Sequence, residues 1–202
     1  MVPPQEVRLI GGRWKRSKLP VLDKPGLRPT PDRVRETLFN WLGQDLSGLS
    51  VLDAFAGSGA LGLEAASRGA AEVLMLERDA SLVRQLQASA TRLGAGMVQV
   101  LCADALNWMQ GAAQQGRRFD IIFIDPPFSA GLYETALQAA APLLVEQGLV
   151  YLEADREFDA AALPCGYATW RHGRAGVVHY HLLRHTALSS ISAYPSSDRS
   201  AP

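Results

Sequence analysis

Short apolar runs alternate with amphipathic segments over most of the chain, from about residue 50 to residue 153. Short apolar runs predict buried strands, and apolar residues spaced three or four apart predict helices. We expect strands at 51–55, 72–76, 98–102, 119–124 and 148–153, and helices at 60–67, 81–93, 105–114 and 132–145. Such an alternation predicts an α/β fold with a mostly parallel sheet, joined through right-handed helical crossovers.

The start of the chain departs from this alternation. Val7–Ile10, a Gly-Gly turn and a basic stretch to Leu22 predict a small β appendage. A loop at 25–31 and a helix at 32–42 follow, because apolar residues recur there at helical spacing. Thr30 is the expected N-cap, with Pro31 at the first helical position, and the helix is expected to end near Gly43.

The end of the chain departs from it as well. Residues 167–171 and 177–183 predict two strands with no helix between them, so an antiparallel hairpin closes the sheet. The tail from 189 to 202 is rich in Ser and Pro and predicts disorder. We therefore divide the chain into an N-terminal hairpin arm at 1–29, one domain at 30–185 and a tail at 186–202.

Composition narrows the class of protein. The chain has 202 residues, 48% of them hydrophobic, which suits one substantial core. Its two cysteines, Cys102 and Cys165, lie far apart without metal-ligand spacing, which predicts neither a disulfide nor a metal site and fits a reducing cytoplasm. No apolar run approaches the roughly 18 residues of a membrane span, and the first residues lack the pattern of a signal peptide.

Charge is distributed unevenly, although the formal net charge is zero. Up to Arg35 there are nine basic and three acidic residues, nine minus three giving +6, so the rest carries −6. A basic arm on an acidic body predicts contact with a polyanion at one face. The residues expected to contact nucleic acid are Arg8, Arg13, Trp14, Lys15, Arg16, Lys18 and Arg28. Trp14 fits two roles equally, a stacking ring or a buried anchor.

A glycine-rich segment follows the first strand of the main alternation, at Asp53–Gly62. It matches the dinucleotide fingerprint G-x-G-x-x-G, and Glu77 lies twenty residues after Gly57, where a ribose-binding acid is expected. The carboxylate of Asp53, four residues before Gly57, disfavours a pyrophosphate and suits a ligand with an ammonium and a sulfonium group. S-adenosylmethionine has both, so it is the expected cofactor, with a nicotinamide cofactor as the alternative.

Other acids follow the next strands. Glu77 is placed to accept hydrogen bonds from ribose hydroxyls, and Asp104 is placed to receive the adenine amino group. Each acid also has a plainer interpretation, because Asp53 and Asp104 suit helix caps and Glu77 suits a surface acid. Their common place at the carboxyl ends of successive strands favours the binding role. The expected cofactor-binding residues are Asp53, Phe55, Gly57, Gly59, Glu77, Asp104, Ala105, Thr30 and Arg33.

The run Asp125-Pro126-Pro127-Phe128 ends another apolar strand and carries the candidate catalytic residues. Two prolines fix their φ angles and offer no N–H, so the Pro126 carbonyl can face outward beside the Asp125 carboxylate. Two such acceptors can hold the two N–H bonds of an exocyclic amine and direct its lone pair at an electrophile. Phe128 offers a face on which a flipped-out base can stack.

Four segments together closely resemble the bacterial family of ribosomal RNA guanine-N2 methyltransferases that act on 16S RNA. They are Arg8–Trp14, Arg28–Trp41, Asp53–Gly62 and Asp125–Phe128, and the resemblance runs from about residue 7 to residue 185. It implies a class I, Rossmann-like methyltransferase sheet of seven strands and S-adenosylmethionine bound at 53–62. It also implies catalysis at 125–128 and a segment 28–40 that folds over the methionine end of the cofactor.

The resemblance further implies a cytoplasmic enzyme that transfers methyl groups to guanine N2. Its partner would be 16S rRNA, within an assembled or assembling small ribosomal subunit, and we expect a monomer without metal or membrane contact. Three alternatives stay open: a DNA adenine-N6 methyltransferase, a noncatalytic RNA-binding assembly factor on the same fold, and a nicotinamide-dependent reductase. The histidines at 172, 179, 181 and 185 are interpreted as surface or core residues rather than as a catalytic base.

Overall fold

The computed structural model describes residues 6–24, 29–128, 131–159, 163–164 and 166–185. The helices are α1 (Asp32–Leu42), α2 (Ala60–Ser67), α3 (Ala80–Leu93), α4 (Ala105–Gln114), α5 (Tyr133–Ala140) and the 3-10 turn η2 (Ala141–Leu143). The strands are β1 (Glu6–Arg8), β2 (Lys18–Pro20), β3 (Ser50–Asp53), β4 (Glu72–Glu77), β5 (Val98–Cys102), β6 (Phe119–Ile124), β7 (Leu144–Ala154), β8 (Tyr167–Ala175) and β9 (Val178–His185). The predicted tail and Arg28 lie outside the described residues.

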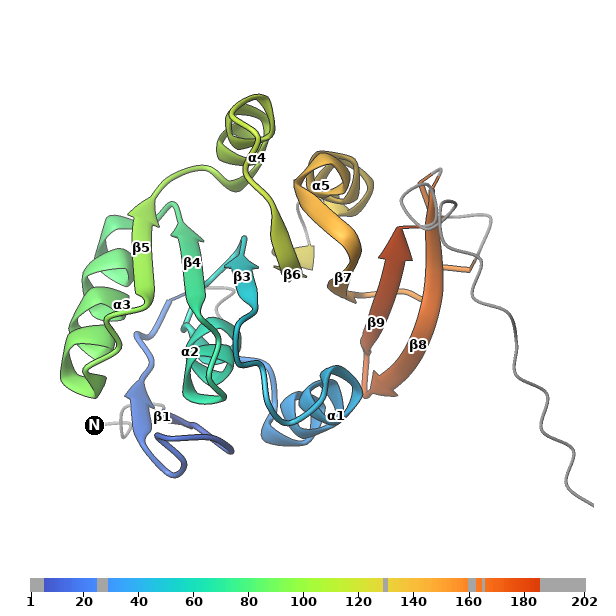
Figure 1. Cartoon of the computed structure of the whole chain (residues 1–202). Coiled ribbons are helices and arrows are strands. Elements are labelled where there is room, and N and C mark those ends of the chain that lie inside the picture. The colour runs from blue at the N-terminus through green and yellow to red at the C-terminus, as the bar shows by residue number, and fades with distance from the viewer. Residues whose placement is uncertain (1–5, 25–28, 129–130, 160–162, 165, 186–202) are drawn as a thin grey trace, which may run out of the picture.

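Seven strands form one sheet in the order β5-β4-β3-β6-β7-β9-β8 (Figure 1). The strands from β5 to β7 run parallel, whereas β9 pairs antiparallel with β7 and β8 pairs antiparallel with β9. The prediction of a mostly parallel seven-stranded sheet closed by a C-terminal hairpin is confirmed. The order of strands reverses between β3 and β6, and open α/β sheets bind ligands at the carboxyl ends of the strands at such a point.

Helices cover both faces of the sheet, with α1, α2 and α3 on one side and α4 and α5 on the other (Figure 1). Neighbouring residues of one strand serve opposite layers: Phe123 packs edge-on against Phe39 of α1, whereas Ile122 belongs to the core under α4 and α5. Burial on both faces explains why the parallel strands read as continuous apolar runs.

The predicted N-terminal β appendage is present as the antiparallel pair β1–β2, and it packs against α2. Ser67, the last residue of α2, donates from its hydroxyl to the Gly11 carbonyl at 2.6 Å and accepts from the Trp14 backbone N–H at 2.9 Å. Trp14 is only 8% exposed and belongs to the main core. The structure therefore gives Trp14 the role of a buried anchor, and its ring is not presented to solvent for stacking.

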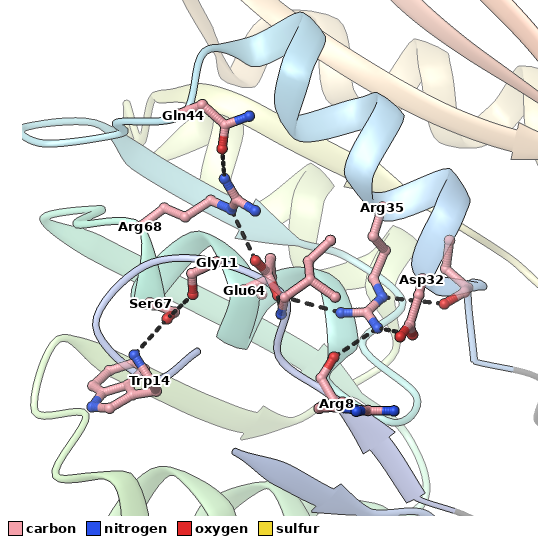
Figure 2. Close-up of polar contacts among 12 residues, drawn as sticks. Arg8, Gly11, Trp14, Asp32, Arg35, Gln44, Glu64, Ser67 and Arg68 are labelled. Carbon is pink, nitrogen blue, oxygen red and sulfur yellow. Dashed lines mark hydrogen bonds and ion pairs between the residues drawn. The ribbon is translucent and has the colours of Figure 1, made fainter. Parts of the chain in front are cut away.

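A buried network of charges joins this hairpin to α1 and α2 (Figure 2). Arg35 of α1 donates to Glu64 of α2 at 3.3 Å and to the Arg8 carbonyl at 2.8 Å. Glu64 also accepts from the Ile10 backbone N–H at 2.8 Å and pairs with Arg68 at 2.9 Å. Because buried charges are stable only when they are paired and hydrogen-bonded, these contacts lock three segments together.

Several local predictions were wrong. The helix expected to reach Val145 ends at Ala140, because Pro142 lacks an N–H and its ring clashes with a preceding carbonyl. Strand β7 then starts at Leu144, earlier than expected. Thr30 does not cap α1, whose N-cap is Pro31, since the Thr30 hydroxyl donates to Glu153 instead. The predicted end of α1 at Gly43 is confirmed. No helix in the described part of the chain is long and apolar enough to cross a membrane.

Candidate active site

A pocket of about 960 Å³ lies at the carboxyl ends of the parallel strands. The loops after β3, β4, β5 and β6 form its floor, the segment before α1 forms one wall, and the tip of the β8–β9 hairpin forms another. Its lining includes Lys24, Thr30, Asp53, Phe55, Gly57, Glu77, Asp104, Ala105, Asp125, Pro126, Pro127, Phe128, Glu153 and residues 175–178. The pocket thus gathers most of the predicted cofactor-binding residues and all four predicted catalytic residues.

The glycine-rich loop turns tightly between β3 and α2. Gly57 donates its backbone N–H to Glu77 at 3.0 Å, which joins the loop to the end of β4. Gly59 has a φ of +78°, and a Cβ atom there would lie 2.4 Å from a methyl carbon of Leu86. Only glycine fits this position without strain, so the turn packs closely against α3, and Gly59 is not among the residues that line the pocket.

Asp53 ends β3 with a carboxylate that is 2% exposed. It accepts from the Gly62 backbone N–H at 2.9 Å, which satisfies one donor in the first turn of α2. Burial raises the pKa of Asp53 to about 7, although the Gly62 hydrogen bond opposes this shift. Asp53 therefore both caps the helix and presents a carboxylate whose charge a cationic ligand would stabilise.

Glu77 and Asp104 also hold backbone while they line the pocket. The second oxygen of Glu77 accepts from the Asp79 backbone N–H at 2.8 Å. Asp104 is the N-cap of α4 and accepts from the Asn107 N–H at 3.0 Å. Nearby, Lys24 bonds Asp79 at 2.8 Å, and this ion pair is partly exposed. The helix-cap interpretation of Asp104 is thus correct, and it does not conflict with a place in the pocket.

Strand register puts three acids on one face of the sheet. Phe123 of β6 pairs with Asp53 of β3 on one side and with Tyr151 of β7 on the other. Side chains two residues apart share a face, so Asp125 and Glu153 face the same way as Asp53. All three carboxylates line the pocket. Burial, followed by the negative charges of Glu153 and Asp53, raises the pKa of Asp125 well above its ordinary value.

Glu153 was not singled out from the sequence, although it ends the predicted strand 148–153. Its carboxylate is 3% exposed and accepts hydrogen bonds from the Thr30 hydroxyl at 2.8 Å and from the Tyr151 hydroxyl at 2.9 Å. Burial raises the pKa of Glu153, and these two donors oppose the shift. Thr30 lines the pocket and bonds Glu153 there, whereas the exposed Arg33 is not part of the pocket lining.

Five of the basic residues predicted to contact nucleic acid are exposed and lie outside the pocket lining: Arg8, Arg13, Lys15, Arg16 and Lys18. Arg13 and its neighbours sit on the hairpin turn beside Ser67, at the end of α2 farther from the pocket. An eight-residue helix is about 12 Å long, so the turn lies roughly that far from the glycine-rich loop. Lys18 is paired with Glu6 at 2.7 Å.

The histidines lie along the β8–β9 hairpin. His181 is buried, and burial lowers its pKa to about 4, which fits the predicted core role. His172 and His179 are stacked, with their ring nitrogens 3.2 Å apart. Together with Glu157 they bring three possible metal ligands within 4.8 Å of one another. The sequence prediction of no metal did not foresee this cluster, which lies outside the pocket lining.

Comparison with known proteins gives the family. The model of the family described as "Conserved hypothetical protein 95" matches residues 7–184. The chain belongs to this family. It is 42% identical over 190 residues to "Ribosomal RNA small subunit methyltransferase D" of Escherichia coli (strain K12), which covers 93% of this chain and 94% of that protein. The Haemophilus influenzae protein of the same name is 38% identical over 181 residues, 88% of this chain and 93% of that one.

A solved structure has the same fold as this member of the family. It is described as an RNA methyltransferase from Salinibacter ruber in complex with S-adenosyl-L-homocysteine. The TM-score is 0.62 at 16% identity, over 86% of this chain and 100% of the other. The predicted class I methyltransferase architecture and the predicted family are both confirmed.

Proposed function

We propose that this protein transfers a methyl group from S-adenosylmethionine to the exocyclic N2 of a guanine in 16S rRNA. The observation that carries the proposal is the convergence of Asp53, the glycine-rich loop and Asp125-Pro-Pro-Phe128 in one pocket. The names of the E. coli and H. influenzae relatives support methyl transfer to small-subunit rRNA over a nicotinamide-dependent reaction.

The residues present fit S-adenosylmethionine, which would supply an electrophilic methyl group on a sulfonium. Asp53 and the backbone of the 57–59 loop would hold its charged and central parts, since a buried carboxylate favours a cation. Glu77 would accept from the ribose hydroxyls, and Asp104 with Ala105 would border the adenine. Thr30 lines the same pocket, and we propose it with Arg33 for the methionine end.

In the proposed reaction the target base leaves its stack and enters beside Phe128. The Asp125 carboxylate and the Pro126 carbonyl accept the two N–H bonds of N2, which aligns the nitrogen lone pair with the methyl carbon. The new N–CH₃ bond forms as the S–CH₃ bond breaks, with its electron pair passing to sulfur. The methylated nitrogen then loses one proton, and no covalent bond to the enzyme forms.

Contact with RNA is assigned to two surfaces in this proposal. The exposed side chains of Arg8, Arg13, Lys15, Arg16 and Lys18 would contact phosphates at a distance from the pocket, and we propose Arg28 as a further phosphate contact. The β8–β9 tip, which forms a pocket wall, would lie nearest the methylated base. We propose small-subunit rRNA within an assembled or assembling subunit as substrate, a monomer as the active form and the cytoplasm as the location.

Radiolabelled S-adenosylmethionine incubated with separate pools of small-subunit RNA, DNA and protein tests the substrate class. Label in RNA at guanine N2 supports the proposal. Label in adenine of DNA supports the alternative DNA methyltransferase, and binding of RNA without label supports a noncatalytic assembly factor. Mass spectrometry of the nucleosides identifies the methylated atom.

Asp125→Ala tests the catalytic assignment. We expect the single-turnover rate to fall about 10²- to 10³-fold, because a hydrogen bond that positions the transition state is lost. Affinity for S-adenosylhomocysteine, measured by calorimetry, is expected to stay within a few fold. Glu146→Ala removes an exposed carboxylate outside the pocket lining and serves as the control. A near-normal rate for Asp125→Ala would refute the assignment.

A further inference from the structure

Glu153 presents one bonded and one unbonded carboxylate oxygen. The Thr30 and Tyr151 hydroxyls both donate to Oε1. Among the residues that the structure describes, none donates to Oε2. Because Glu153 lines the pocket, Oε2 is the atom that a ligand can reach.

A carboxylate in this position calls for a donor. A buried acid without hydrogen bonds is costly, and a buried polar atom that faces a pocket is commonly satisfied by a ligand or water. Both hydroxyls donate to the carboxylate and stabilise its ionised form, which can only accept hydrogen bonds. Glu153 is thus held in a fixed orientation as an acceptor.

The strand order tells which part of the pocket Glu153 faces. Asp53, Asp125 and Glu153 follow β3, β6 and β7, so Glu153 is separated from Asp53 by the intervening strand. Adjacent strands lie about 4.8 Å apart, which places Glu153 roughly two strand spacings from the glycine-rich side. Its neighbour on the other side is β9, which pairs Tyr180 with Glu153 and begins at the hairpin tip that forms a pocket wall. Glu153 therefore borders the half of the pocket that would hold the target base, on the far side of Asp125 from the glycine-rich loop.

The donors on a guanine suit this arrangement. Its Watson–Crick edge carries an N1–H next to the N2 amine, whereas adenine carries an unprotonated N1 that only accepts. We propose that Glu153 accepts the N1–H of the target guanine, while Asp125 and the Pro126 carbonyl hold N2. This inference rests on the proposed function. It makes Glu153 the residue that selects guanine, because its oxygen would meet a second acceptor if adenine were bound.

An RNA with 2-aminopurine at the target position tests the inference together with a Glu153 variant. This base keeps the N2 amine and replaces N1–H with an acceptor, and because it also lacks O6, the change of preference in the variant isolates the N1 contact. The guanine methylated by the wild-type protein is first mapped by mass spectrometry, and RNAs with guanine or 2-aminopurine at that position are then compared. We expect the wild type to prefer guanine by about 10²-fold or more in kcat/KM, since sites built around a hydrogen bond reject analogues that lack it.

Glu153→Gln supplies the decisive variant. Its amide oxygen can still accept from Thr30 and Tyr151, while its NH₂ group can donate to the unprotonated N1 of 2-aminopurine. We expect the preference for guanine to fall below about tenfold or to reverse. Glu146→Gln, on the same strand but exposed, is expected to keep the wild-type preference.

Two outcomes would overturn the inference: equal wild-type rates on the two RNAs, or an unchanged preference in Glu153→Gln. If the variant with an unchanged preference also loses affinity for S-adenosylhomocysteine, Glu153 is assigned to the cofactor. The comparison of the two RNAs by the wild type does not depend on the folding of any variant. Failure of the proposed function is a separate result, because the wild type would then methylate no guanine in either the RNA pool or the guanine-containing RNA.

Discussion

The two β-hairpins at the ends of the fold differ in how they are held and in what they border. The turn of the N-terminal β1–β2 hairpin is fixed to the end of α2, and a Cβ atom on Gly12 would lie 1.8 Å from the Ser67 carbonyl oxygen. The tip of the C-terminal β8–β9 hairpin is open, with Val177 68% exposed, and it borders the pocket. The more basic of the two hairpins is therefore the one that lies farther from the candidate active site.

The difference shows that the number of basic residues in a segment does not tell how close that segment lies to the candidate active site. The C-terminal hairpin, residues 167–185, carries three arginines and no acidic residue. Its Trp170 is 38% exposed, with Arg184 over the ring at 3.9 Å and Arg171 at 5.0 Å. An exposed aromatic ring beside guanidinium groups is a surface on which a nucleic acid base can stack. The arginines are spread along the hairpin, however: Arg174 lies beside the tip that borders the pocket, whereas Arg184 pairs with Ala168 at the opposite end.

The largest expected effect breaks the attachment of the N-terminal hairpin. Glu64→Gln leaves Arg35 and Arg68 without their shared carboxylate in a buried environment, and removal of one partner of a buried pair commonly costs about 3 to 5 kcal/mol. The free energy of unfolding in urea measures this loss. Lys18→Gln breaks the exposed pair with Glu6 and is expected to leave stability nearly unchanged. Equal losses in the two variants would contradict the role of the buried network.

A smaller loss is expected for Gly12→Ala. Its positive φ of +69° is unfavourable for alanine by about 1 to 2 kcal/mol, and the close approach to Ser67 adds to this cost. Gly48 has a φ of +81° with open space around it, so Gly48→Ala contains the backbone strain alone. Urea unfolding measures the loss of stability in both variants, and the loss in Gly12→Ala beyond that in Gly48→Ala is due to the contact with Ser67. Equal losses would mean that the hairpin turn shifts without cost.

The smallest effect separates the two hairpins as RNA surfaces. Replacing Arg8, Arg13, Lys15, Arg16 and Lys18 with Gln is expected to weaken the binding of long RNA and to flatten its salt dependence, because contacts with phosphates are lost. Each lost phosphate contact removes about 0.7 to 0.9 from the slope of log K against log salt. The change Arg174→Gln, beside the tip of the β8–β9 hairpin, is expected to weaken binding of a short RNA that reaches only the pocket. The affinities of both RNAs are measured at several salt concentrations for each variant and for the wild type. Parallel slopes of log K against log salt for a variant and the wild type would exclude the altered hairpin from the interface.

Features that depend on local pattern could be predicted from the sequence. Asp53 and Asp125 follow apolar runs and carry their motifs beside them, so their place at one sheet edge followed from the parallel topology. Thr30 could not be paired with Glu153, because 123 residues separate them and only the packing of α1 against the sheet brings them together. Trp14 had two possible roles for the same reason, since its burial depends on contacts with α2. Arg35 gave no sequence signal that it would be buried among Glu64 and Asp32.

Three acids on one sheet face also have a consequence for proton exchange with the solvent. Without a cation nearby, burial and mutual repulsion keep part of this group protonated near neutral pH, as the pKa of about 7 for Asp53 indicates. A positively charged ligand stabilises the ionised forms and lowers these pKa values, so its binding expels protons into the buffer. By linkage, affinity for such a ligand rises as the pH increases through 7 and falls below it, where the acids are already neutral. In the proposed reaction, loss of the sulfonium charge would raise these pKa values again, so the acids would take up protons at methyl transfer.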